Sequence, residues 1–168
     1  MCGIAGIVSK NQSLVSTNRI KQGIACLTHR GPESNQTWLN ASGSVTLAHS
    51  RLSIIDLDER AAQPLHYGDR FTIIHNGELY NYIELKKQLE QKGFRFKTTS
   101  DTEVIVAAYA AWGTECLQRF DGMFAFAIWD EKEQKLFAAR DRFGEKPFFF
   151  FLMNQNLFLL PSLRHYGN

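Results

Sequence analysis

The sequence predicts an α+β fold with antiparallel sheets in a single domain. Strand-like segments come first, helical segments follow, and further strand-like segments close the chain. Regular alternation of strand and helix is missing, which argues against a parallel Rossmann-type sheet. The 168 residues are about one domain's worth, 44% of them are apolar, and no repeat or linker divides them.

The first half of the chain predicts one helix and several short strands. Residues 3–9 are typical of a buried strand, with glycines that let another backbone come close. Thr17 is placed to cap a helix with apolar residues on one face. Further strands are predicted at residues 45–48, 52–55 and 71–74, and the last of them ends at His75-Asn76-Gly77.

Two capping signatures open the helices predicted in the second half. Asn81 with Glu84 resembles a capping box, before a helix that stops at Gly93. Ser100 with Glu103 repeats this signature before an apolar helix. Four further strands are predicted at residues 123–129, 135–139, 147–152 and 156–160.

Charge and hydropathy limit the classes of partner. The chain has 19 Lys plus Arg against 17 Asp plus Glu, so neither nucleic acid nor an anionic membrane is predicted. Its longest apolar runs are far shorter than the roughly 20 residues of a membrane span, and no signal peptide is predicted. Three scattered cysteines, Cys2, Cys26 and Cys116, indicate no disulfide scaffold or metal site, and favour a reducing cytoplasm.

Cys2 is the most informative residue. The initiator methionine is normally removed before a small residue, which leaves Cys2 with a free α-amine. An α-amine has a pKa of about 7.7–8.0 and a thiol about 8.5, so the amine can take the thiol proton near neutral pH. Cys2 would then be an N-terminal nucleophile with its own base. The alternative is a small apolar residue that opens a strand.

Six motifs follow the start Met-Cys-Gly-Ile-Ala-Gly-Ile, at residues 29–34, 48–56, 75–81, 100–103, 121–126 and 140–147. Among them are His-Arg-Gly-Pro-Glu-Ser, His-Asn-Gly-Glu-Leu-Tyr-Asn and Ser-Asp-Thr-Glu. In this order they resemble class II glutamine amidotransferases, which are N-terminal-nucleophile hydrolases, and within them the glutaminase domain of asparagine synthetase. The resemblance covers residues 2–150. It implies one type-2 amidotransferase domain with four αββα layers, two stacked antiparallel sheets lying between helices.

The resemblance implies a covalent mechanism centred on Cys2. Its Sγ would attack the side-chain amide of glutamine, releasing ammonia and leaving a glutamyl thioester that water hydrolyses. The side-chain amide of Asn76 and the backbone N–H of Gly77 would stabilise the oxyanion of the tetrahedral intermediate. Taken alone, Asn-Gly more often marks a hairpin turn, but the helix cap predicted at Asn81 and the context of the motifs outweigh this alternative.

The resemblance also implies how glutamine is held. Arg51 would bind the α-carboxylate, since a guanidinium matches the planar carboxylate group. Glu78 and Asp101 would bind the α-ammonium, and the carbonyls of Leu52 and Ile54 would add backbone contacts. The alternatives are a surface arginine for Arg51, a solvated loop residue for Glu78 and a plain N-cap for Asp101.

Other candidate residues are interpreted as structural. Cys26 and Cys116 are predicted to be buried thiols, and His29 and His49 to be structural hydrogen-bonding residues. Arg140 and Asp141 are predicted to form an internal ion pair. His66, His75 and His165 lack metal-ligand spacing.

The Ser-Gly-Gly-x-Asp-Ser loop that grips ATP in the synthetase domain is absent, and Ser42-Gly43-Ser44 is the nearest string. The resemblance therefore implies no cofactor for this chain, since ATP and magnesium would belong to the missing synthetase domain. Glutamine is the implied substrate, and a synthetase domain or subunit the implied partner. Residues 151–168 depart from the family pattern. They leave open a catalytically idle remnant, or a module that binds glutamine or a synthetase.

Four consecutive phenylalanines, Phe148 to Phe151, mark the end of the chain. Successive strand side chains face opposite sides, so two of them point each way. We expect an exposed apolar patch over residues 148–153 and 157–160. The isolated chain is therefore expected to self-associate or to require a partner.

Overall fold

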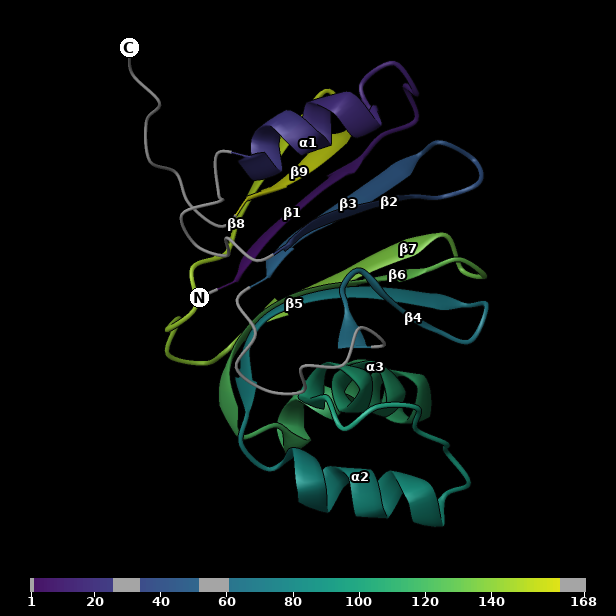
Figure 1. The fold of residues 1–168 in the computed structure, drawn as a ribbon, viewed down its shortest axis with the longest axis vertical. Coiled ribbons are helices and arrows are strands. Elements are labelled where there is room, and N and C mark those ends of the chain that lie inside the picture. Colours follow the sequence, from purple (N-terminus) through teal and green to yellow (C-terminus); the bar gives the residue numbers. More distant parts are fainter. Residues whose placement is uncertain (1, 26–33, 52–60, 161–168) are drawn as a thin grey trace.

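The fold is two antiparallel sheets packed face to face between helical layers (Figure 1). The computed structural model describes residues 2–25, 34–51 and 61–160. Helix α1 (Thr17–Ala25) covers one sheet, while α2 (Tyr82–Gln91), α3 (Asp101–Trp112) and the 3₁₀ helix η2 (Gly113–Arg119) lie beyond the other. These four layers confirm the αββα architecture.

Nine strands among the described residues build the two sheets. They are β1 (Gly3–Val8), β2 (Ser34–Leu39), β3 (Val45–Arg51), β4 (Leu65–Tyr67), β5 (Phe71–Leu79), β6 (Gly122–Asp130), β7 (Lys135–Arg140), β8 (Phe149–Met153) and β9 (Asn156–Leu160). The first sheet has the order β2-β3-β1-β9-β8 and the second β4-β5-β6-β7. All described pairings are antiparallel. Cys2 directly precedes β1, the central strand of the first sheet, and Asn76 lies on β5, an inner strand of the second sheet.

Strand alternation decides which side chains lie between the sheets. Ile4 of β1, Leu47 of β3 and Ile74 of β5 all belong to the apolar cluster between the sheets. The neighbouring residues face outward toward the helices. Ala5 packs in the cluster with α1, and Ile73 packs in the cluster with α3. Even-numbered residues of β1 and β5 therefore face the space between the two sheets.

The structure confirms most predicted elements, but β2, β4 and η2 were not predicted. β2 is mostly polar (Ser-Asn-Gln-Thr-Trp-Leu) and lies at a sheet edge, so it lacks the apolar alternation of a typical strand. β5 continues through Leu79, beyond its predicted end. The hairpin-turn interpretation of Asn76-Gly77 is therefore wrong. The strand predicted at residues 52–55 lies outside the described residues.

Two of the predicted helix caps are wrong. Helix α1 already begins at Thr17, and its cap is the preceding Ser16, whose Oγ accepts a hydrogen bond from the backbone N–H of Arg19 at 3.2 Å. Asn81 stands at the start of α2, but its side chain does not cap the helix. Its amide instead bridges the backbone of residues 119 and 121. Asn81 therefore holds the end of η2 beside the start of β6.

No helix among the described residues is long and apolar enough to cross a membrane.

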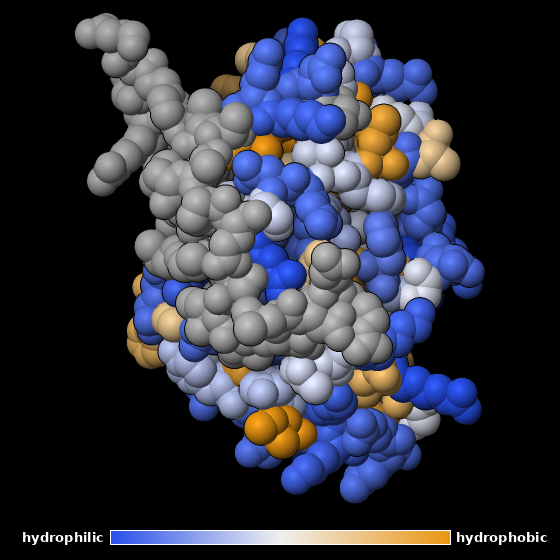
Figure 2. Space-filling model, viewed as in Figure 1, coloured by the Kyte–Doolittle hydropathy of each residue, from blue (hydrophilic) through white to orange (hydrophobic). Residues whose placement is uncertain are grey.

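The C-terminal strands form the exposed apolar edge only in part. Phe150 is 72% exposed and Leu152 67% exposed on the edge strand β8, and Phe151 and Met153 are also exposed. Leu159 of β9 is buried, because β9 lies between β8 and β1. The predicted patch is therefore correct for β8 and for Leu160, partly correct for the half-buried Leu157 and Phe158, and wrong for Leu159. On the face shown in Figure 2, hydrophobic residues form small spots on a mainly hydrophilic surface.

Replacing Phe150 and Leu152 together with lysine will suppress self-association of the isolated chain. The unpaired backbone N–H and C=O groups of an uncharged, apolar edge strand can pair with the same strand of a second copy. Natural proteins often prevent such pairing with a lysine on the edge strand. Sedimentation velocity at micromolar concentration measures the effect. The matched control is Ile83→Lys, which places a charge at an exposed apolar residue of α2. Equal association of the β8 variant and the control contradicts the prediction, as does an unsubstituted chain that stays monomeric.

Candidate active site

Two strands of the first sheet bring Cys2 and Arg51 together. Cys2 directly precedes β1 and Arg51 ends β3. The ladder pairs Gly3 with Ser50, so its next step places Cys2 opposite Arg51. Side chains two residues apart on a strand point to the same face. Cys2 therefore points the same way as Ile4, and Arg51 the same way as Leu47, into the space between the two sheets. Both residues are partly buried.

Asn76 approaches the same space from the second sheet. Its side chain points the same way as that of Ile74, which packs between the sheets. β5 runs toward the same end of the molecule as the N-terminus (Figure 1). Asn76 is 1% exposed, yet neither its Oδ1 nor its Nδ2 has a hydrogen-bond partner among the described residues. An unpaired buried amide costs about 1–3 kcal/mol. A bound ligand that supplies the missing partners removes this cost.

Gly77 meets a steric requirement inside β5. Its φ is +146°, a conformation that side chains with a Cβ rarely adopt. An ideal Cβ at this position would lie 2.1 Å from the carbonyl oxygen of Met123 on β6. Only glycine allows β5 and β6 to approach this closely beside Asn76.

Asp101 reaches the end of β5 from the first turn of α3. Its Oδ2 accepts a hydrogen bond from the backbone N–H of Leu79 at 3.0 Å, and the residue is 6% exposed. Ser100 is the N-cap, and its side chain accepts the N–H of Thr102. The plain N-cap interpretation of Asp101 is therefore wrong. Glu78 is half-buried on β5 beside Gly77. The predicted residues Leu52 and Ile54 lie outside the described residues.

Residues 1–164 match the family described as glutamine amidotransferase domain. The chain belongs to this family. It is 44% identical over 154 residues to asparagine synthetase [glutamine-hydrolyzing] 3 of Bacillus subtilis (strain 168), and 35% identical over 179 residues to amidase chry2 of Gibberella zeae. The matches cover 89% and 99% of this chain, but 25% and 26% of the relatives. The chain thus spans about a quarter of the length of these curated relatives.

Solved structures of similar fold include a glutamine phosphoribosylpyrophosphate amidotransferase of B. subtilis and an allosteric regulatory enzyme of purine biosynthesis. Their TM-scores are 0.75 and 0.76, each at 23% sequence identity. The matches cover 94% and 95% of this chain, and 41% and 42% of those chains. This likeness confirms the N-terminal-nucleophile hydrolase fold of the amidotransferase domain.

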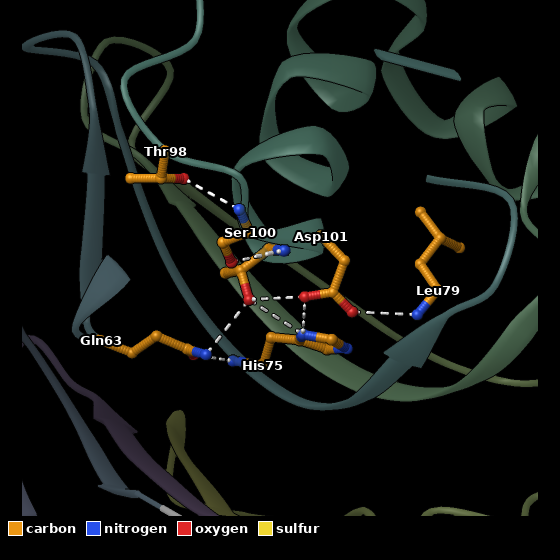
Figure 3. A network of polar contacts seen from close by, with 7 residues as sticks. Gln63, His75, Leu79, Thr98, Ser100 and Asp101 are labelled. Atoms are coloured by element: carbon orange, nitrogen blue, oxygen red, sulfur yellow. Dashed lines mark hydrogen bonds and ion pairs between the residues drawn. The ribbon is translucent and has the colours of Figure 1, made fainter. Parts of the chain in front are cut away.

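A buried polar network of this amidotransferase domain joins β5 to α3 (Figure 3). Sequence reasoning did not predict the roles of its members Gln63, His75 and Thr102. The Gln63 amide Nε2 lies 3.2 Å from Thr102 Oγ1, and Gln63 Oε1 accepts the backbone N–H of His75 at 2.5 Å. His75 Nδ1 lies 3.1 Å from Thr102 Oγ1. His75 directly precedes Asn76, so the network holds the strand segment that carries the candidate oxyanion donor.

Glu103 fixes the loop before α3 instead of completing a capping box with Ser100. Its carboxylate accepts the backbone N–H groups of Lys97 and Thr98, at 2.9 and 2.8 Å, and the hydroxyl of Thr98 at 2.7 Å. Thr98 Oγ1 in turn accepts the N–H of Ser100. The loop therefore holds the first turn of α3, and with it Asp101, in one position.

Two buried histidines of the amidotransferase domain are uncharged at neutral pH. Burial lowers the pKa of His49 to about 3, with a further decrease from nearby His75, while a hydrogen bond with the His75 backbone opposes the decrease. Burial also lowers the pKa of His75, although Asp101 opposes this decrease. The contact of His49 with the β5 backbone agrees with its predicted structural role. Within the part of the chain that the structure describes, no group of His, Cys, Asp and Glu is arranged to hold a metal ion.

Cys116 and Asp141 have structural roles. Cys116 is fully buried, which confirms the predicted buried thiol, and burial raises the pKa of this thiol to about 12. The predicted ion pair of Asp141 with Arg140 is wrong. The Asp141 carboxylate instead accepts the backbone N–H groups of residues 143, 145 and 146. Cys26 and His29 lie outside the described residues. A hollow of about 310 Å³ beside η2 is lined by other residues than the predicted site.

Proposed function

We propose that this chain hydrolyses glutamine to glutamate and ammonia, and that the ammonia supports asparagine synthesis. The observation that carries the proposal is the unpartnered, buried amide of Asn76, which faces the same space between the sheets as Cys2. Membership of the glutamine amidotransferase family and the printed names of the asparagine synthetase relatives support it. The test is ammonia release from glutamine by purified chain.

The proposed reaction uses Cys2 as nucleophile and its own amine as base. Methionine removal frees the α-amine, which takes the thiol proton. A bond then forms between Sγ and the side-chain carbonyl carbon of glutamine. The Asn76 amide and the Gly77 N–H donate hydrogen bonds to the oxyanion. The protonated amine of Cys2 returns the proton to the leaving nitrogen, ammonia departs, and water cleaves the resulting thioester to glutamate.

In the proposed pocket, different residues bind the two charged groups of glutamine, its α-carboxylate and its α-ammonium. Arg51 forms a charge-assisted pair with the α-carboxylate, since it ends the strand opposite Cys2. Glu78 and Asp101 hold the α-ammonium from β5 and α3. The carbonyls of Leu52 and Ile54 complete this proposed pocket. The reaction uses no metal or organic cofactor from this chain, and the nucleophilic thiol must stay reduced, which supports a cytoplasmic location.

A second candidate function is a non-catalytic module that binds glutamine or a synthetase partner. The exposed apolar side chains of β8 favour this candidate, because patches of this kind often mark interaction sites. A synthetase domain or subunit, or a second copy of the chain, is the proposed partner. Glutamine binding without ammonia release supports the second candidate over the first.

Arg51→Ala and Asn76→Ala will affect different kinetic constants. Loss of Arg51 removes a contact to the α-carboxylate in both ground and transition state, so KM rises by a factor that corresponds to about 2 kcal/mol or more of lost binding free energy. Loss of Asn76 removes a donor used mainly in the transition state, so kcat falls by about 10²–10³-fold. Steady-state ammonia release measures both constants. If both variants lower only kcat by the same factor, this division of roles is wrong.

A further inference from the structure

Thr102 lies at the centre of the polar network between β5 and α3. It is 2% exposed, and its Oγ1 is 3.2 Å from Gln63 Nε2, 3.1 Å from His75 Nδ1 and 3.5 Å from Asp101 Oδ1. Figure 3 shows the side chains of Gln63, His75 and Asp101 converging near the first turn of α3. One hydroxyl thus faces an amide, an imidazole and a carboxylate.

The directions of these hydrogen bonds follow from the donors available. Gln63 Oε1 accepts the backbone N–H of His75, so Gln63 Nε2 donates to Thr102 Oγ1. The hydroxyl hydrogen then has two possible acceptors, His75 Nδ1 and Asp101 Oδ1. If it turns to His75, the proton of the neutral ring sits on Nε2. That Nε2 is buried and has no partner among the described residues, and an unpaired buried donor is costly.

The other tautomer satisfies more groups. With the ring proton on Nδ1, His75 donates to Thr102 Oγ1, and the hydroxyl of Thr102 points to Asp101 Oδ1. The other oxygen of this carboxylate, Oδ2, already accepts the N–H of Leu79. Both oxygens of Asp101 then face a donor, and the carboxylate is held in one orientation at the start of α3.

We propose that Thr102 is a positioning residue for glutamine binding, whose hydroxyl orients the Asp101 carboxylate toward the α-ammonium of the substrate. This inference rests on the proposed function, in which Asp101 binds that ammonium. The network connects the two ends of the pocket, because His75 precedes Asn76 and Thr102 follows Asp101 in the chain. Thr102 acts through Asp101 and touches no reacting atom.

The decisive comparison pairs Thr102→Val, which keeps the side-chain shape without the hydroxyl, with Thr102→Ser, which keeps the hydroxyl. Two substrates are assayed: glutamine, and its analogue 4-carbamoylbutanoate, which lacks only the α-amino group. Thr102→Val lowers kcat/KM for glutamine by about 10- to 100-fold, mainly through KM, since a hydrogen bond to a charged group is lost. The analogue is hydrolysed equally by Thr102→Val and the unsubstituted chain. Thr102→Ser restores glutamine hydrolysis.

Thr46→Val is the matched control. Thr46 is also a fully buried threonine, and its Oγ1 donates to the carbonyl of Trp38 at 2.9 Å, away from the candidate site. We expect unchanged kinetics for this variant on both substrates. Thermal unfolding of both valine variants shows whether either loses its fold. If Thr102→Val loses the same factor on both substrates, or if Thr102→Ser fails to restore activity, the inference is overturned.

Two further measurements separate this inference from the proposed function. Asp101→Asn tests the carboxylate itself. If it weakens glutamine hydrolysis and spares the analogue while Thr102→Val changes neither, the proposed role of Asp101 stands and that of Thr102 fails. Calorimetric titration of glutamine into Cys2→Ala, with and without Thr102→Val, gives the comparison without turnover. A weaker affinity of the double variant supports the inference even if no ammonia is released, whereas an equal affinity overturns it.

Discussion

Cys2→Ala will abolish the release of ammonia from glutamine. Loss of the nucleophile in a hydrolase that works through a covalent intermediate lowers kcat by on the order of 10⁶-fold. Here the thiol and the proposed base belong to one residue, which faces the space between the sheets at the start of the central strand β1. Ammonia release under saturating glutamine measures the loss. Intact-mass spectrometry of the unsubstituted chain will show that Met1 has been removed.

Covalent labelling identifies the nucleophile independently of turnover. A diazoketone analogue of glutamine will modify Cys2 in the unsubstituted chain and leave Cys2→Ala unmodified. Cys116 is an internal control, because its thiol is fully buried and burial raises its pKa to about 12. Peptide mapping locates the modification. Equal labelling of Cys2→Ala, or label found on Cys116, contradicts the assignment of Cys2.

Local sequence patterns predict elements whose side chains carry their own signal. β1 is an apolar run at the start of the chain, and α3 follows a capping serine, so both were predicted close to their observed ends. β2 is polar and lies at the edge of its sheet, where it forms a hairpin with the following strand β3, so its own residues lack the apolar alternation of a typical strand. β5 extends through Asn76-Gly77-Glu78 because β6 pairs with it along its whole length. Pairing with a strand that is distant in the sequence leaves no recognisable pattern in the residues of the segment that it extends.

The residues of the candidate site also fall into those that the sequence itself indicates and those that it does not. Cys2 carries chemical information of its own, because only the second residue can gain a free amine when methionine is removed. The other predicted residues depend on the resemblance. Gln63, His75 and Thr102 were not predicted as a network, since their contacts join residues up to 39 positions apart. The available signal was the parity of β5, which turns His75 toward α3 when Asn76 faces Cys2.

Gly77 is the position at which a single added methyl group should harm both stability and activity. A Cβ at residue 77 would lie 2.1 Å from Met123 O and 2.7 Å from Phe124 Cα, both atoms of the β6 backbone. Backbone atoms cannot move aside as a side-chain tip does, so β5 and β6 must separate. Strain at a positive φ and overpacking each cost about 1–3 kcal/mol. The damage falls beside Asn76, whose amide would be displaced from the oxyanion.

Gly77→Ala is therefore expected to lower the free energy of unfolding by about 2–6 kcal/mol, and to reduce kcat even where the chain remains folded. Urea denaturation and ammonia release at a temperature of full folding measure the two effects. Gly68→Ala is the matched control, since Gly68 also has a positive φ (+59°) but has no atom within 4 Å of the added Cβ. That control isolates backbone strain away from the site, so it should lose only the strain cost of about 1–3 kcal/mol and no activity. If both variants behave alike, the close approach of β6 is not what requires glycine at residue 77, and the oxyanion donors do not depend on it.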